Sequence, residues 1–142
     1  MNININLYLL IILFTTFLSC RQNPYAQGER IYEKYCLNCH MEDGQGFRLL
    51  YPPLAESDYL LQNFEKLPCI IRYGIISPTI VNDQRFDLPM LGIKELNEVE
   101  ITNLINYINF RWEYQDTQIK ISDVQESLNN CDPLKNQPGI AN

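Results

Sequence analysis

The sequence predicts an all-α domain of three to five helices, with room for one small two-stranded excursion. Apolar residues recur at helical spacing in two separate segments, 27–35 and 97–112. Two shorter segments, 58–64 and 67–73, are flanked by residues that favour helix ends. A strand pattern is visible only at 79–86, on either side of Asn82-Asp83. Helices therefore make up most of the predicted fold.

The length and charge of the chain limit what it can be. Its 142 residues suffice for one domain with a core of its own. The formal net charge of -6 argues against nucleic acid as a partner, because phosphate binding needs a basic face. The same charge serves solubility or, alternatively, steers the protein toward a basic docking patch on a partner protein. Both readings of the charge stay open.

An uncharged apolar block occupies residues 7–18 and is broken only by two threonines. It is shorter than the roughly 20 residues of a membrane-spanning helix and fits the apolar core of an export signal. The block ends at Phe17-Leu18-Ser19-Cys20, which resembles the bacterial lipoprotein signal box. In such a box the cysteine is lipidated and becomes the new N terminus. We expect residues 1–19 to be a signal peptide and Cys20 to carry acyl chains.

Several acyl chains on Cys20 would hold the protein on a membrane surface, since each buried CH₂ contributes about 0.8 kcal/mol. The alternatives are an uncleaved anchor or a plain secretory signal. Residues 20–26 are polar and contain a proline, as expected of a tether between lipid and folded domain. The prediction is an extracytoplasmic lipoprotein, anchored to a membrane on the periplasmic side of a bacterium.

The first predicted helix, 27–35, leads directly into the segment Cys36-Leu37-Asn38-Cys39-His40. This spacing is that of c-type haem attachment, in which two thiols bond to the haem vinyl groups and the histidine binds the iron. Zinc binding and dithiol redox chemistry are the alternatives. The other cysteines are scattered singly, whereas a zinc site needs a second ligand pair. A thioredoxin-like motif would follow a strand of a βαβ unit, which is not visible.

The residues around this motif resemble those of class I cytochromes c. In that family a glycine and an aromatic residue of the first helix cross a C-terminal helix that carries Leu-x-x-Tyr. Gly28 and Tyr32 match the first half of the crossing, and Leu104 and Tyr107 match the second. The resemblance covers residues 27–112 and implies a class I cytochrome c fold wrapped around one covalently bound haem c.

The helix 97–112 is also predicted from its own residues. Asn97 and Glu100 have the spacing of a capping box. An apolar stripe follows, made of Val99, Ile101, Leu104, Ile105 and Ile108. Glycine at the crossing allows close backbone approach, so we expect Gly28 to matter for folding.

The segment between the two main helices is expected to surround the haem. Residues 41–46 form a turn-rich loop, which in the resemblance wraps the haem edge. Pro52 stands where the family has a proline whose carbonyl accepts a hydrogen bond from the axial histidine, and Leu54 is expected to pack on the haem. A rigid turn of two prolines is compatible with both roles. Ser57 is expected to cap helix 58–64, in which Tyr59, Leu60 and Leu61 would face inward.

The second axial ligand of the iron is expected to be Met90. His40 is the only histidine of the chain, and Met41 beside it cannot reach the opposite face of the haem. Met90 lies 50 residues after His40, in the loop where the family has its axial methionine. Many relatives have Met-Pro, whereas Pro89 precedes Met90 here. The alternative is a core or surface methionine.

Two cysteines remain once lipid and haem have taken the others. Cys69 and Cys131 are a possible disulfide pair in an oxidising compartment, and two buried free thiols are the alternative. Residues 113–142 form a C-terminal extension beyond the resemblance. A short capped helix is expected there at 122–128, with little order after Pro133.

These features predict an electron-transfer protein rather than an enzyme. It would carry single electrons between redox partner proteins, with His40 and Met90 on the iron. The first alternative is a haem-bearing subunit of a larger oxidase, dehydrogenase or reductase. The second is a haem sensor or weak peroxidase in which Met90 dissociates to admit a ligand.

Overall fold

The computed structural model describes residues 23–76 and 78–132. The predicted signal peptide, the predicted lipidation site Cys20 and the segment after Asp132 lie outside the described residues. Helices dominate, and the predicted all-α class is confirmed. The helices are α2 (Ala26–Tyr35), α3 (Leu37–His40), α4 (Asp58–Gln62), the 3-10 helix η1 (Phe64–Lys66), α5 (Leu67–Tyr73), α6 (Glu98–Trp112) and α7 (Ile121–Asn129). Within the described ranges, no helix has the length and apolar character needed to cross a membrane.

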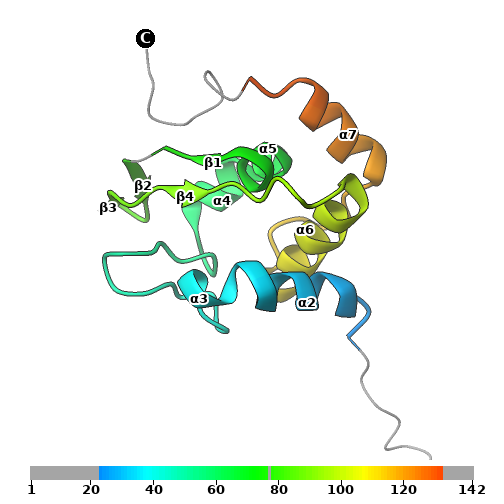
Figure 1. The fold of residues 1–142 in the computed structure, drawn as a ribbon. Helices are drawn as coiled ribbons and strands as arrows, with labels where there is room; N and C mark the ends of the chain where they lie inside the picture. The colour runs from blue at the N-terminus through cyan, green and yellow to red at the C-terminus, as the bar shows by residue number, and fades with distance from the viewer. Residues whose placement is uncertain (1–22, 77, 133–142) are drawn as a thin grey trace, which may run out of the picture.

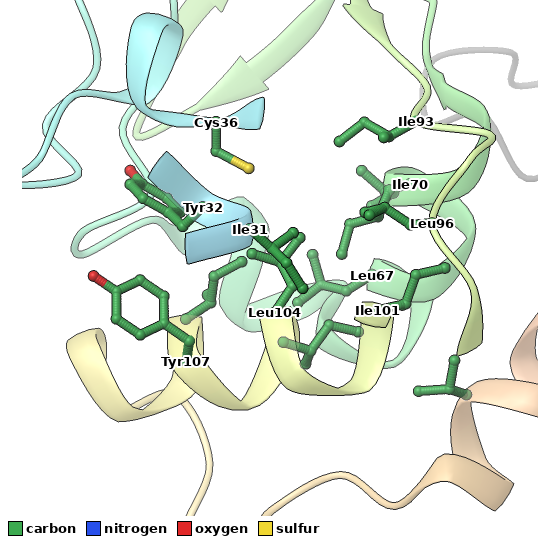
Figure 2. Packing of buried hydrophobic residues seen from close by; sticks show 14 of the residues in the cluster. Ile31, Tyr32, Cys36, Leu67, Ile70, Ile93, Leu96, Ile101, Leu104 and Tyr107 are labelled. Atoms are coloured by element: carbon green, nitrogen blue, oxygen red, sulfur yellow. The ribbon is translucent and has the colours of Figure 1, made fainter. Parts of the chain in front are cut away.

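The crossing of α2 and α6 organises the fold (Figure 1). Gly28 lies at the crossing, where a Cβ atom would come within 2.6 Å of the Cβ of Tyr107 and 2.8 Å of the carbonyl carbon of Asn103. Only glycine permits this approach without movement of α6. One turn later, the ring of Tyr32 packs on that of Tyr107 with centroids 5.6 Å apart (Figure 2). The predicted helix crossing is therefore confirmed.

Helix α6 begins with the predicted capping box. The Glu100 N–H donates to the Asn97 side chain over 3.0 Å, and the Asn97 N–H donates to the Glu100 carboxylate over 2.8 Å. Ile101 is completely buried, as are Leu104 and Ile105. Val99 is 47% exposed, so its predicted place in the apolar stripe is wrong. A helix turns about 100° per residue, which puts Val99 about 200° away from Ile101 and toward solvent.

The predicted helix 58–64 is two elements, because α4 ends at Gln62 and η1 follows it. The Ser57 hydroxyl accepts a hydrogen bond from the Leu60 N–H, as predicted. Leu60 is buried, whereas Leu61 is 57% exposed and does not face inward. The two side chains point about 100° apart, and only that of Leu60 is directed at the core. Gly74 has φ 81° and ends α5, again as predicted.

Two small sheets lie between α5 and α6. Strands β2 (Thr79–Val81) and β3 (Gln84–Phe86) form the predicted hairpin, with positive φ at Asn82 and Asp83 in its turn. Strands β1 (Gly74–Ile75) and β4 (Met90–Leu91) form a second antiparallel pair in which Ile75 lies opposite Met90. This second pair was not predicted. Two-residue strands have no periodic pattern that a sequence could reveal.

The C-terminal extension is part of the core. Helix α7 packs on α5 and α6, on the side away from α2 (Figure 1), and its Val124 is completely buried. Asn106 of α6 exchanges two hydrogen bonds with the backbone of Ile119, at 3.0 and 2.9 Å. Cys69 of α5 is joined by a disulfide to Cys131, 62 residues further along the chain. These contacts hold the extension against the helices that carry the site.

Candidate functional site

An apolar cavity of about 340 Å³ lies between α3, α5, α6 and the two small sheets. The structure brings all the residues predicted to bind the cofactor to its wall, namely Cys36, Cys39, His40, Pro52, Leu54 and Met90. Aliphatic and aromatic side chains form most of the remaining lining, among them Leu67, Ile70, Ile71, Phe86, Ile93, Leu104 and Ile108. A large apolar group with one or more polar anchors therefore suits the cavity.

The two thiols come from the break between α2 and α3. Helix α2 ends at Tyr35, and α3 is a single turn in which the His40 N–H donates to the Cys36 carbonyl over 2.9 Å. Cys36 is buried and its sulfur is directed into the interior of the molecule (Figure 2). Cys36 and Cys39 are the free cysteines among the described residues. Burial, with a smaller contribution from Cys39, raises the pKa of the Cys36 thiol to about 12, so the buried sulfur stays uncharged.

His40 is oriented by a backbone atom. Its imidazole Nδ1 lies 3.0 Å from the carbonyl oxygen of Pro52. The carbonyl can only accept, so Nδ1 carries the proton and Nε2 keeps a free lone pair. Burial lowers the pKa of His40, although the bond to Pro52 opposes this shift. A neutral imidazole with a free Nε2 is the form that binds a metal ion, and the bond at Nδ1 makes it a stronger ligand.

The loop after His40 is held in place from both main helices. The Tyr32 hydroxyl of α2 donates to the Met41 carbonyl over 2.6 Å, and the Trp112 indole of α6 donates to the Asp43 carbonyl over 3.3 Å. The Gly44 carbonyl then accepts from the N–H of Leu54 over 2.7 Å. These hydrogen bonds hold the loop so that Pro52 and Leu54, which follow it, lie at the cavity wall. The role of Trp112 was not predicted, because it depends on a contact between residues far apart in the sequence.

Met90 is positioned by the unpredicted pair of strands. Its partner Ile75 belongs to β1, which directly follows α5, and α5 forms one wall of the cavity. Close to this strand pair in the chain, the Ile93 N–H donates a hydrogen bond to the Ile71 carbonyl over 2.8 Å. The half-buried Met90 side chain lines the cavity that His40 also lines. A thioether and an imidazole are thus available to one bound group.

Comparison with known proteins identifies the family. The family model described as cytochrome C oxidase, cbb3-type, subunit III, matches residues 23–108, which include every element from α2 to most of α6. The chain belongs to the mono-haem cytochrome c family. Within that family, cytochrome c-552 of Thermus thermophilus is 30% identical over 91 residues, which are 61% of this chain and 69% of the relative.

A second group of relatives is much longer than this chain. The cytochrome c subunit of alcohol dehydrogenase (quinone) from Gluconobacter oxydans (strain 621H) is 28% identical over 116 residues. The match covers 79% of this cytochrome c but only 24% of that subunit. A similar subunit from Komagataeibacter europaeus is 29% identical over 87 residues, which are 18% of its length. This chain therefore spans about a quarter or less of these subunits.

The family membership means that this cytochrome c carries one covalently bound haem c and transfers electrons. The cavity fits that group. Two free thiols could take up the vinyl groups, and the free Nε2 of His40 and the sulfur of Met90 could bind iron. The apolar walls suit the macrocycle. Tyr59 also lines the cavity, and its hydroxyl is buried without a hydrogen-bond partner in the protein.

Proposed function

We propose that this cytochrome c carries single electrons between redox partners while anchored to a membrane on its periplasmic side. In this proposal Cys36 and Cys39 hold the haem, and His40 and Met90 bind its iron. One observation carries the proposal: the two free thiols, the oriented imidazole and the methionine sulfur all lie on the wall of one apolar cavity.

Haem iron supplies a reversible one-electron change, and the residues of the chain determine how it is used. The Pro52 carbonyl keeps the His40 ring in one orientation, so that the ligand does not rotate between oxidation states. A methionine sulfur favours reduced iron and raises the potential relative to a second imidazole. With His40 and Met90 both bound to the iron, the site would have no free position for oxygen. Such a site suits electron transfer.

The proposed anchor is the lipidated Cys20. The lipoprotein signal box supports it. The Cys69–Cys131 disulfide supports a location outside the cytoplasm, because disulfides persist in oxidising compartments. The net charge of -6 would steer the anchored protein toward a basic patch on a partner. Replacement of Cys20 by Ser is expected to move the holoprotein from the membrane fraction to the soluble fraction. Retention of the Cys20→Ser variant on the membrane with residues 1–19 removed would argue against lipid anchoring.

The experiment that tests the whole proposal combines absorption spectra with mass spectrometry of the mature protein. The oxidised spectrum should contain the weak band from sulfur bound to iron. The mass should show loss of residues 1–19, one haem, acyl chains and two hydrogens fewer for the disulfide. A haem protein without the sulfur-to-iron band would remove Met90 from the proposal. A mass without acyl chains would remove the anchor.

The names of the matching family and of several relatives favour a second candidate function. The matching family model describes a subunit of a cbb3-type oxidase, and several relatives are the cytochrome subunit of an alcohol dehydrogenase. In this alternative the chain is a haem-bearing subunit of a larger oxidoreductase. Mild detergent extraction followed by size-exclusion chromatography separates the two functions. A stoichiometric complex that withstands high salt supports the subunit, and a monomer supports the free carrier.

A further inference from the structure

The turn that leads from the cavity wall into α4 is held by a tyrosine of the C-terminal extension. The Tyr114 hydroxyl accepts a hydrogen bond from the Ser57 N–H over 2.9 Å and donates one to the Leu54 carbonyl. A tyrosine hydroxyl has one proton to donate and lone pairs that accept. Tyr114 uses both functions, one at each end of the turn 54–57. It acts from outside the cavity, because its side chain is not part of the cavity wall.

The turn 54–57 has a backbone conformation that needs support. Glu56 has φ 54°, in the left-handed region that residues other than glycine rarely adopt. Such a conformation persists only when surrounding contacts hold it. The Gly44 carbonyl accepts from the first two N–H groups of the turn, over 2.7 and 2.9 Å. The Tyr114 hydroxyl bonds to the chain on both sides of Glu56 and so holds the strained residue between its two partners.

Tyr114 is itself fixed at the point where α6 ends. Glu113 has φ 54°, so the helix stops there and the chain changes direction. The Asn109 side chain then exchanges two hydrogen bonds with the backbone of Gln115, at 2.7 and 3.0 Å. The Tyr114 ring also packs near that of Phe64, with centroids 6.2 Å apart. Burial raises the pKa of Tyr114, although the bond from the backbone N–H opposes this shift, so the hydroxyl keeps the proton that it donates.

The turn is joined directly to the group that orients His40. The Pro52 carbonyl, which lies 3.0 Å from the Nδ1 atom of His40, is only two residues before Leu54. The residue between them is Pro53, whose ring restricts rotation of the chain. A displacement of Leu54 is therefore transmitted to the Pro52 carbonyl rather than absorbed between the two residues. Both Pro52 and Leu54 line the cavity.

We propose that Tyr114 is a positioning residue of the haem site, whose hydroxyl holds the turn 54–57 and thereby keeps the Pro52 carbonyl against the His40 imidazole. The inference rests on the proposed function, because it requires His40 to be the ligand of the haem iron. It also goes beyond the family match, which ends at residue 108 and does not reach Tyr114. Through this residue the C-terminal extension takes part in the site, in addition to packing on the core.

The test compares Tyr114→Phe with Tyr25→Phe in the reduced, diamagnetic holoprotein. Each variant loses one tyrosine hydroxyl. The hydroxyl of Tyr25 accepts from the Gln118 side chain, so the control also breaks a contact with the extension, but away from the cavity. Nuclear magnetic resonance measures solvent exchange of the His40 Nδ1 proton and of the amide protons in the buried part of α6. We expect Tyr114→Phe to speed exchange of the His40 proton about tenfold relative to those amides, because two backbone hydrogen bonds of the turn are lost. Tyr25→Phe should leave the ratio unchanged, and a purely structural role of Tyr114 would speed both kinds of proton alike.

A measurement on the unaltered protein keeps the inference testable even if Tyr114→Phe folds poorly. The Tyr114 hydroxyl proton should show a nuclear Overhauser contact to the Ser57 amide proton. Absence of this contact would overturn the inference, and so would an unchanged exchange ratio in Tyr114→Phe or an equal change in Tyr25→Phe.

The two proposals fail in different ways. If the His40 ring protons of the unaltered holoprotein lack the large shifts of an imidazole bound to haem iron, the proposed function is wrong whatever Tyr114 does. If they have these shifts, and Tyr114→Phe leaves the exchange ratio unchanged, only the inference about Tyr114 is wrong.

Discussion

The imidazole Nδ1 of His40 lies 3.0 Å from the carbonyl oxygen of Pro52, twelve residues further along the chain. A backbone atom thus determines which imidazole nitrogen is free to bind a metal. The proline ring is not the hydrogen-bonding group. It stiffens the turn that presents the carbonyl, and the Gly44 carbonyl holds the next turn through the Leu54 N–H. The site is therefore built on loop geometry as much as on side chains.

Met90→Ala should abolish the weak sulfur-to-iron band of the oxidised protein. The reduced variant should then bind carbon monoxide quickly, because one axial position is open. Met41→Ala is the matched control, since Met41 does not line the cavity and its carbonyl still accepts from Tyr32. Persistence of the band in Met90→Ala would show that another group is the ligand. Rapid carbon monoxide binding by the unaltered protein would instead favour the sensor or peroxidase function.

Gly74→Ala should weaken Met90 ligation without altering the Met90 side chain, because the added Cβ would meet the Met90 backbone carbonyl. Gly74 has φ 81°, and a Cβ there would lie 2.7 Å from the Gly92 nitrogen, so the β1–β4 pair would have to open. Strain of this kind costs about 2 kcal/mol. On heating, the sulfur-to-iron band should vanish well below the unfolding temperature measured by circular dichroism. Leu91→Ala is the control, because that side chain is 81% exposed in the same strand pair. Loss of both signals together in Gly74→Ala would contradict this account.

Gly28→Val should damage the fold rather than the redox chemistry. A side chain at residue 28 would force α2 away from Asn103 and Tyr107 of α6, and overpacking of this kind costs about 3 kcal/mol. Thermal unfolding measures the loss. The midpoint potential of the protein that remains folded should stay close to the original. Gln27→Ala, on the exposed side of the same helix, should unfold at the normal temperature.

Cys131→Ser should destabilise the domain by up to about 4 kcal/mol, because the disulfide closes a loop of 62 residues. Helix α7 would lose the covalent link that holds it near α5, although the two hydrogen bonds between Asn106 and the Ile119 backbone would remain. The unaltered protein treated with a reductant should unfold like the variant. If reductant leaves the unfolding temperature of the unaltered protein unchanged, the bond is absent in solution or contributes little.

The parts of this fold that could be predicted have local or fixed-spacing signals. The capping box at Asn97 and Glu100, the cap at Ser57 and the turn at Asn82 each involve residues within a few positions. The crossing at Gly28 was predicted from motifs at both ends of the domain. The errors at Leu61 and Val99 arose because an apolar residue one or two positions from a buried one can point away from the core, which sequence order alone does not resolve.

Other features of the site carry no such signal. The β1–β4 pair that positions Met90 is too short to show a pattern, and it forms because α5 and the segment before α6 meet. The Tyr114 hydroxyl forms hydrogen bonds with the Leu54 carbonyl and the Ser57 N–H, which lie 60 and 57 residues earlier in the chain. Nothing near Tyr114 in the sequence indicates these partners.

The sequence by itself determined the chemistry, because Cys36, Cys39 and His40 must be close neighbours along the chain to meet one haem. The resemblance to class I cytochromes c implied the helix crossing, where glycine at residue 28 lets two backbones approach closely. Only the tertiary structure decided how the wall of the cavity at Met90 is formed. The β1–β4 pair at Met90 depends on long-range contacts, whose free energy exists only once distant segments have packed.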